Sequence, residues 1–176
     1  MKIYKLHENN IPNVAKLMST IQPAFWNYQG AMKQLGGTKE SIKTVGWFIG
    51  EDEVHPKGWV LCRELVLYKT IELECCGFDE DGVFLSEHKL ESLFDIICEY
   101  AIEKGYLSFK TTMGSQQFNI HKRVLGNIGD EINNLEADNR IDYDWLLDYG
   151  FKVIGIQPNA YGEKFHCIML SKDLRS

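Results

Sequence analysis

The chain has 176 residues, of which 44% are hydrophobic and 25% are charged, so we expect it to bury a core rather than remain disordered. A formal net charge of −6 without a Lys/Arg cluster argues against nucleic-acid binding, which needs a basic face to neutralise phosphates. No apolar run is long enough for a membrane span and the N-terminus has no signal-peptide core, so we expect a cytoplasmic protein without a membrane partner.

The cysteines are odd in number and lack the spacing of a metal site or a disulfide framework. Neither a CxxC pair nor a His–Cys spacing typical of zinc occurs. We therefore expect buried free thiols in a reducing compartment, and no metal. The five residues are Cys62, Cys75, Cys76, Cys98 and Cys167.

The first half of the chain predicts a strand, a helix and three further strands. Residues 2–6 alternate as a strand, and apolar residues at helical spacing run from Ile11 until Pro23 ends the helix. Residues 24–37 are mixed, and residues 38–41 are expected to open a short helix. Strands are expected at 45–51, 58–65 and 68–78. In the last of these, strict alternation places Ile71, Leu73 and Cys75 on one face, and Thr70, Glu72 and Glu74 on the other.

The second half begins with the strongest helical pattern. Apolar residues recur at three and four positions over residues 90–104, and Gly105 ends the helix. A strand is expected at 106–112. The polar stretch 114–138 reads as an insertion with a short helix at 118–125. A helix at 143–148, stopped by Gly150, precedes strands at 151–156 and 165–171.

Three local features resemble the GNAT acyltransferase superfamily. They are the strand pair 58–65 and 68–78 that leads into helix 90–104, the ending Glu-Tyr-Ala-Ile-Glu-Lys-Gly-Tyr at residues 99–106, and Asn139 eleven residues before Gly150-Phe151. The element order is similar to that family over nearly the whole chain. The resemblance implies an α/β (α+β) fold with a mixed, mostly antiparallel central sheet of six to seven strands flanked by helices. It also implies a single domain over residues 1–176, with the insertion at 114–138.

The resemblance further implies transfer of an acyl group from acetyl-coenzyme A to a small-molecule or peptide amine, by a monomer or homodimer. In this family the pyrophosphate sits at a helix N-terminus, where free N–H groups and the helix dipole favour an anion. That position corresponds here to Ser86, Glu87, His88, Lys89 and Leu90. The segment 85–90 departs from the family because it has no glycine and follows the acidic run 79–81. Two interpretations remain open: the segment holds phosphate, or Ser86 is only an N-cap and Glu87 complements the dipole.

The catalytic residues implied by the resemblance also leave alternatives. Glu72 or Glu74 would remove the amine proton, unless both belong to a solvated strand face. Leu146 replaces the tyrosine that often protonates the leaving thiolate, so Tyr149 or Tyr143, on the same helix face, would substitute unless both only pack.

The remaining expected contacts concern the cofactor and the acceptor. Backbone N–H groups in the strand before the long helix would polarise the thioester carbonyl, and the family's Asn would also contact the cofactor. These positions are Cys75, Cys76, Gly77, Phe78 and Asn139. Trp26 and Tyr28 would line an acceptor pocket or simply pack in the core. The rival to an enzyme is a binding module with the same fold and a degenerate coenzyme A site.

Overall fold

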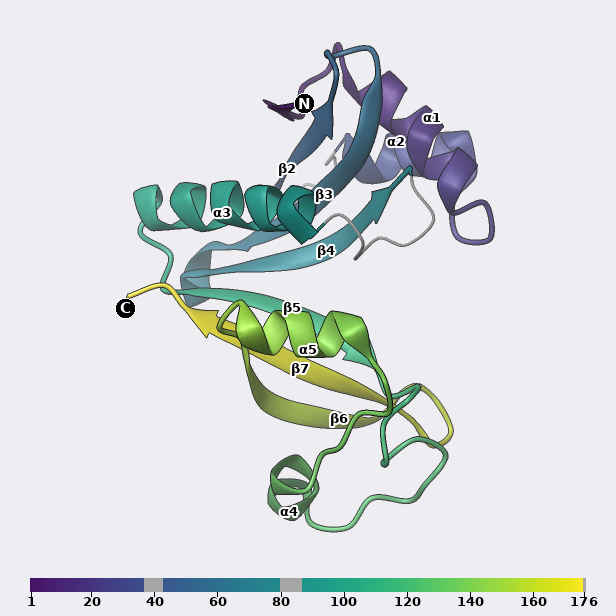
Figure 1. The fold of residues 1–176 in the computed structure, drawn as a ribbon, viewed down its shortest axis with the longest axis vertical. Coiled ribbons are helices and arrows are strands. Elements are labelled where there is room, and N and C mark those ends of the chain that lie inside the picture. Colours follow the sequence, from purple (N-terminus) through teal and green to yellow (C-terminus); the bar gives the residue numbers. More distant parts are fainter. Residues whose placement is uncertain (37–42, 80–86, 176) are drawn as a thin grey trace. The chain divides into compact units, whose positions relative to one another are not determined.

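The computed structural model describes residues 1–36, 43–79 and 87–175. The chain divides into two compact units, the first spanning Met1–Leu107 and the second Ser108–Ser176. Each unit combines antiparallel strands with helices (Figure 1). The short helix expected at residues 38–41 lies outside the described residues.

The first unit contains four strands in the order β1-β2-β3-β4. All neighbouring pairs are antiparallel, and β2 and β3 are joined by a short turn. The strands are β1 (Lys2–Lys5), β2 (Lys43–Gly50), β3 (Pro56–Leu65) and β4 (Thr70–Phe78). They confirm the strands expected in this half, except that residues 66–68 form a 3₁₀ turn instead of extending β4.

Among its described residues, the first unit has the helices α1 (Ile11–Ile21) and α2 (Tyr28–Leu35) beside a third helix. Helix α1 begins as the sequence predicts, with a proline in its first turn. Helix α2 was not expected, because residues 24–37 show no clear apolar period. It is started by the side chain of Asn27, whose Oδ1 accepts a hydrogen bond of 2.7 Å from the Gly30 N–H.

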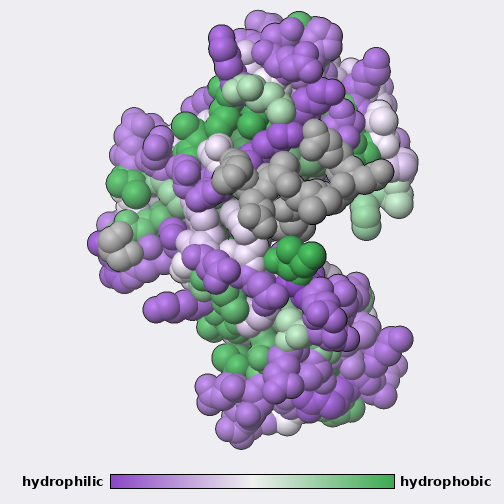
Figure 2. Space-filling view, viewed as in Figure 1, coloured by the Kyte–Doolittle hydropathy of each residue, from purple (hydrophilic) through white to green (hydrophobic). Residues whose placement is uncertain are grey.

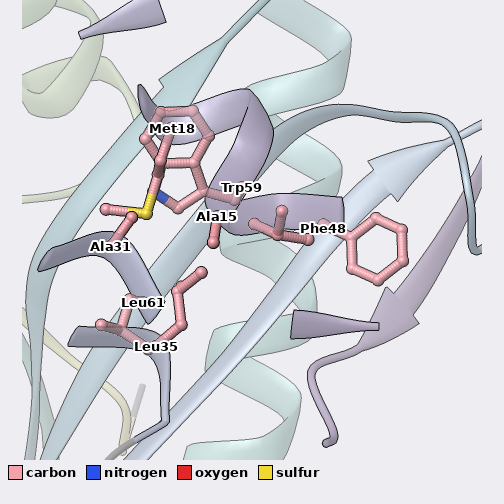
Figure 3. Close-up of a cluster of buried hydrophobic side chains, with 8 residues drawn as sticks. Ala15, Met18, Ala31, Leu35, Phe48, Trp59 and Leu61 are labelled. Atoms are coloured by element: carbon pink, nitrogen blue, oxygen red, sulfur yellow. The ribbon is translucent and has the colours of Figure 1, made fainter. Parts of the chain in front are cut away.

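The cluster formed by α1, α2 and one face of the sheet is the main core of this unit. Trp59 and Phe48 are fully buried there, and Gly77 leaves room for the Trp59 ring where any side chain would collide with it. Figure 3 shows how the side chains of the two helices meet those of β2 and β3. The cluster consists of Val14, Ala15, Met18, Ala31, Leu35, Phe48, Trp59 and Leu61.

Helix α3 (Glu87–Glu103) lies on the opposite face of the first unit's sheet. Trp47 precedes the core residue Phe48 in β2, so its side chain points to the other face, where it meets the edge of Tyr100 at 5.2 Å. The helix buries the apolar stripe that its sequence predicts, and leaves Glu91, Asp95, Glu99 and Glu103 exposed.

The second unit contains three antiparallel strands in the order β5-β7-β6. They are β5 (Ser108–Gly114), β6 (Lys152–Gly162) and β7 (Phe165–Asp173), accompanied by the helices α4 (Ile128–Asn133) and α5 (Ile141–Asp148). Phe109 and Phe151 meet edge to face at 5.2 Å in its core.

The segment 114–138 is irregular, as predicted, but its helix lies elsewhere. The helix expected at 118–125 is wrong, because Lys122 adopts a φ of 59°, which a right-handed helix does not allow. Helix α4 forms later because the Asn127 Oδ1 accepts hydrogen bonds from the N–H groups of Gly129 and Asp130.

Most of the visible surface is hydrophilic (Figure 2). Within residues 1–36, 43–79 and 87–175, no helix is long and apolar enough to cross a membrane.

Candidate functional site

The strand β4 carries a bulge at the residues predicted to do chemistry. Cys62 pairs with Leu73 and Leu61 pairs with Cys75, so Glu74 has no register partner on β3. An extra residue in one strand shifts the faces of the residues that follow it. Cys75 therefore packs against the α1–α2 core cluster, on the same side as Glu72, and the expectation that Cys75 shares a face with Ile71 and Leu73 is wrong.

The two carboxylates of β4 meet one arginine from β3. The Arg63 Nη2 lies 3.4 Å from the Glu72 Oε2, and the Arg63 Nε forms an ion pair with the Glu74 Oε2. The Gln34 Nε2 of α2 donates a hydrogen bond of 3.2 Å to the other oxygen of Glu74. The side chains of Glu72 and Glu74 remain 21% and 25% exposed, so both are accessible yet held by a cation instead of lying on a freely solvated face.

The C-terminal half of β4 offers backbone groups rather than side chains. Burial raises the pKa of the Cys75 thiol to about 12, so it stays protonated and is a poor nucleophile at neutral pH. The Cys76 carbonyl oxygen accepts a hydrogen bond of 3.2 Å from Gln22. Gly77 has no side chain and Phe78 is buried. Gly77 and Phe78 can therefore contact a ligand only through their main chain, whereas Cys75 and Cys76 are half-buried.

The first turn of α3 is the predicted anion site. Ser86 lies outside the described residues, and so do the side chains of Glu87 and His88, although both residues begin the helix. Lys89 is half-buried, and Leu90 is buried in the core, so Leu90 can offer a ligand only its main chain. The first N–H groups of any α-helix lack intrahelical partners, which leaves them available to an anion.

Asp79, the described member of the acidic run before this helix, is partly neutralised. The Lys57 Nζ lies 3.2 Å from the Asp79 Oδ2, with both side chains partly exposed. This pairing lowers the repulsion that an approaching anion would meet from Asp79. Residues 80 and 81, which complete the run, lie outside the described residues.

In the second unit, Tyr149 is more exposed than Leu146. Tyr149 follows the last residue of α5 and stacks on Trp145 with ring centroids 5.1 Å apart. The Lys172 Nζ lies 4.6 Å from the Tyr149 ring centroid and donates to the Tyr149 carbonyl oxygen at 2.5 Å. Leu146 and Tyr143 are both buried, and burial raises the pKa of Tyr143. Of the two tyrosines, Tyr149 is the less buried one.

Asn139 also lies in the second unit, in an exposed turn. Its φ is 50°, a left-handed conformation that asparagine tolerates, and its Nδ2 donates to the Asp138 Oδ1 at 3.1 Å. Its neighbour Arg140, which the sequence did not single out, donates to the carbonyl oxygens of Gly114 and Gln116 at 2.6 and 2.7 Å. Arg140 thereby fixes the end of β5.

The aromatic residues between α1 and α2 divide between core and surface. Trp26 is half-buried and packs against the α1–α2 core cluster, whereas Tyr28 is 42% exposed and Phe25 is 80% exposed. Trp26 thus contacts the core cluster, and Tyr28 lies at the surface.

Metal chemistry finds no support in the described residues. Among them, no three His, Cys, Asp or Glu side chains gather as a metal-binding group. All five cysteines are free thiols.

Comparison with known proteins gives matches among solved structures. No protein-family model and no curated protein matches the chain. The aminoglycoside 6′-N-acetyltransferase from Enterococcus faecium matches with a TM-score of 0.80 at 15% identity, covering 100% of this chain and 98% of that one. An aminoglycoside 6′-N-acetyltransferase complexed with coenzyme A matches with a TM-score of 0.84 at 13% identity and the same coverage. The chain has the GNAT N-acetyltransferase fold.

A solved structure with a lower TM-score shares the same fold. The ribosomal-protein-S18-alanine N-acetyltransferase from Escherichia coli matches with a TM-score of 0.66 at 10% identity, over 99% of this chain and 94% of that one. The expected mixed α/β architecture, with mostly antiparallel strands flanked by helices, is thereby confirmed. The roles of the individual site residues remain predictions.

Proposed function

We propose that this protein is an N-acetyltransferase that uses acetyl-coenzyme A as the acyl donor. The observation that supports it most is the match of the entire chain to a coenzyme A complex at a TM-score of 0.84. The first unit adds accessible carboxylates on a bulged β4 and the first turn of the 17-residue helix α3. A binding module that ignores coenzyme A would need neither feature.

Acetyl-coenzyme A supplies the acetyl group as a thioester when bound. We assign its pyrophosphate to the main-chain N–H groups at the start of α3, from Ser86 to Leu90, with His88 and Lys89 as basic neighbours. We assign the thioester to the main chain of residues 75–78, and we retain Asn139 as a further cofactor contact. The pairing of Lys57 with Asp79 supports this assignment, because it partly offsets the negative charge before the helix.

The proton of the acceptor amine is assigned to Glu72 or Glu74. The amine nitrogen attacks the thioester carbonyl carbon, the carbon–sulfur bond breaks, and the amine proton passes to the carboxylate directly or through water. The Arg63 guanidinium forms ion pairs with both carboxylates and so keeps them next to each other on this face of the sheet. The coenzyme A thiolate takes a proton from water or, as we propose, from the Tyr149 hydroxyl.

The acceptor is an amine, as it is for the matched acetyltransferases that act on aminoglycosides and on the alanine of ribosomal protein S18. We place the acceptor beside the α1–α2 link, with Tyr28 as a contact and Trp26 as the packed residue behind it. The free thiols fit a reducing compartment, so we assign the protein to the cytoplasm. We expect a monomer or a homodimer, which light scattering after size-exclusion chromatography distinguishes.

The test is release of free coenzyme A, followed with a thiol reagent, in the presence of acetyl-coenzyme A and a panel of amines. The panel contains aminoglycosides and peptides with an N-terminal alanine. We expect turnover with at least one amine, and mass spectrometry should show an acetylated product. Binding of acetyl-coenzyme A without turnover on any amine would contradict the enzymatic role, and absence of binding would support the rival binding module.

A further inference from the structure

A cavity of about 270 Å³ opens in the first unit at the edge of β2. Strand β1 ends at Lys5, and the Leu6 N–H bonds to the Gly46 carbonyl oxygen at 2.9 Å. Strand β2 begins before that point, at Lys43, so its first residues have no register partner on β1. The cavity occupies the place where β1 stops.

The walls of this cavity differ in chemistry. Leu6, Ile11, Leu35 and Leu61 form an apolar wall on the side of α1 and α2. The opposite wall is basic, because Lys5, Lys43 and Lys104 line it together with Glu64 and Tyr100.

The Glu64 carboxylate, which carries the negative charge of the cavity lining, already has hydrogen-bonding and ionic partners. The Glu64 carboxylate accepts hydrogen bonds from the hydroxyls of Tyr100 and Tyr106 at 2.8 and 3.0 Å. It also pairs with the Lys43 Nζ at 3.0 Å, and the Glu64 side chain is only 1% exposed. The charges of Lys43 and Glu64 therefore offset each other, although Glu64 lies in the cavity lining.

Two ammonium groups remain without a carboxylate partner in the described part of the chain. The Nζ atoms of Lys5 and Lys104 lie 5.0 and 5.7 Å from the Tyr100 ring centroid, and neither forms an ion pair with a described residue. Glu103 of α3 also lies near Tyr100, and it forms no ion pair with Lys5 or Lys104. Both positive charges attract an anion to this wall of the cavity.

We propose that this cavity binds a small organic anion. Its carboxylate would pair with Lys5 and Lys104, and its short hydrocarbon body would lie against Leu6, Ile11 and Leu35. Pairing of a carboxylate with an ammonium group and burial of a few methylene groups both favour such a ligand over a neutral or purely inorganic one. The charged wall of this site is separate from the proposed base, because Glu64 and Tyr100 lie on the face of the sheet opposite Glu72.

Titration of the ¹⁵N-labelled protein with hexanoate tests the proposal. We expect saturable shifts of the amide resonances of Leu6, Thr44 and Gly46, which surround the cavity. 1-Hexanol, the neutral counterpart, should bind at least about tenfold more weakly, since it lacks the charge. Equal affinity for both, equally tight binding of inorganic phosphate, or absence of saturable shifts at these amides would overturn the proposal.

Charge-removing variants give an independent readout. Lys5→Gln and Lys104→Gln should each weaken hexanoate binding about tenfold, the loss of one charge-assisted contact. Lys16→Gln, at an exposed position on α1 outside the cavity lining, is the matched control and should bind hexanoate like the unmodified protein. Unchanged binding in the Lys5/Lys104 double variant, with its amide spectrum still that of the folded protein, would also overturn the proposal.

Discussion

Glu64 on β3 and Glu74 on β4 are both carboxylates held by cations in one sheet, yet their surroundings suit opposite roles. Glu64 accepts from two tyrosine hydroxyls and a lysine and is 1% exposed. Glu74 pairs with Arg63 and Gln34, sits on the bulge, and keeps a quarter of its side chain exposed. A saturated, sealed carboxylate stabilises the fold, whereas a partly open one can exchange a proton with a bound molecule.

The different surroundings of Glu64 and Glu74 follow from the pleat of β3. Arg63 and Glu64 follow each other in sequence, so their side chains point to opposite faces. Arg63 meets the carboxylates of β4, and Glu64 meets the tyrosines on the α3 side. One strand thus supports both the candidate site and the packing of the helix.

The largest effect is expected from removing the base. Of the variants Glu72→Gln and Glu74→Gln, the one that replaces the base should lower kcat/KM about 10²- to 10⁴-fold, the usual contribution of a general base. The other should change it much less. Steady-state release of coenzyme A measures both.

The matched control for that experiment is Glu51→Gln, an exposed carboxylate at the turn after β2. It should leave turnover unchanged. If neither β4 variant lowers kcat/KM beyond the level of this control, the assignment of a β4 carboxylate as the base is wrong.

The next effect concerns stability instead of catalysis. Glu64→Leu leaves two buried or half-buried tyrosine hydroxyls without their acceptor, so we expect a loss of about 2–4 kcal/mol in the free energy of unfolding. Urea denaturation measures this loss. Activity of the folded fraction should be retained, and a stable but inactive variant would place Glu64 in the chemistry and reverse the comparison.

Tyr149→Phe sharpens the assignment of the acid. Phenylalanine keeps the stacking on Trp145 and the contact with the Lys172 ammonium but removes the hydroxyl. We expect kcat to fall up to about tenfold, because water can replace the tyrosine as proton donor. Tyr143→Phe, at a buried position, should leave kcat unaltered, and equal losses in both variants would argue for packing alone.

The smallest expected effect is the pH dependence of the contribution that Glu64 makes to the free energy of unfolding. Burial alone would raise the pKa of Glu64, but the hydrogen bonds from Lys43, Tyr100 and Tyr106 outweigh burial and hold that pKa below its usual value. A lowered pKa in the folded state means stability that is present above the unfolded value and lost as the pH falls below it.

The difference in unfolding free energy between the unmodified protein and Glu64→Gln should therefore be constant near neutral pH. It should shrink once the pH drops below the ordinary glutamate range. A difference that grows on acidification would show that the pKa is raised instead.

The sequence predicted the parts of the fold that periodicity encodes. Apolar residues at three and four positions gave α3, because the same stripe that identifies a helix is the one that it buries. The strand expected at 106–112 begins instead at Ser108. The reason is that Gly105, with a φ of 74°, and Tyr106 belong to the end of the helix.

The sequence could not show the bulge or α2. A bulge inserts one extra residue into a strand. The alternation of apolar and polar residues along β4 does not indicate that this residue is Glu74, which has no register partner on β3. Helix α2 depends on the Asn27 cap more than on an apolar stripe. Arg63 was missed as well, although opposite charges on neighbouring strands, Arg63 against Glu72, were the signal that could have found it.

Calorimetric titration with acetyl-coenzyme A tests the central claim most directly, because it requires no knowledge of the acceptor. The account predicts saturable binding of one acetyl-coenzyme A per chain, with Glu74→Gln binding as tightly as the unmodified protein, since that carboxylate is assigned to the proton and not to the cofactor. Absence of heat at millimolar acetyl-coenzyme A, in a sample shown to be folded, would contradict it.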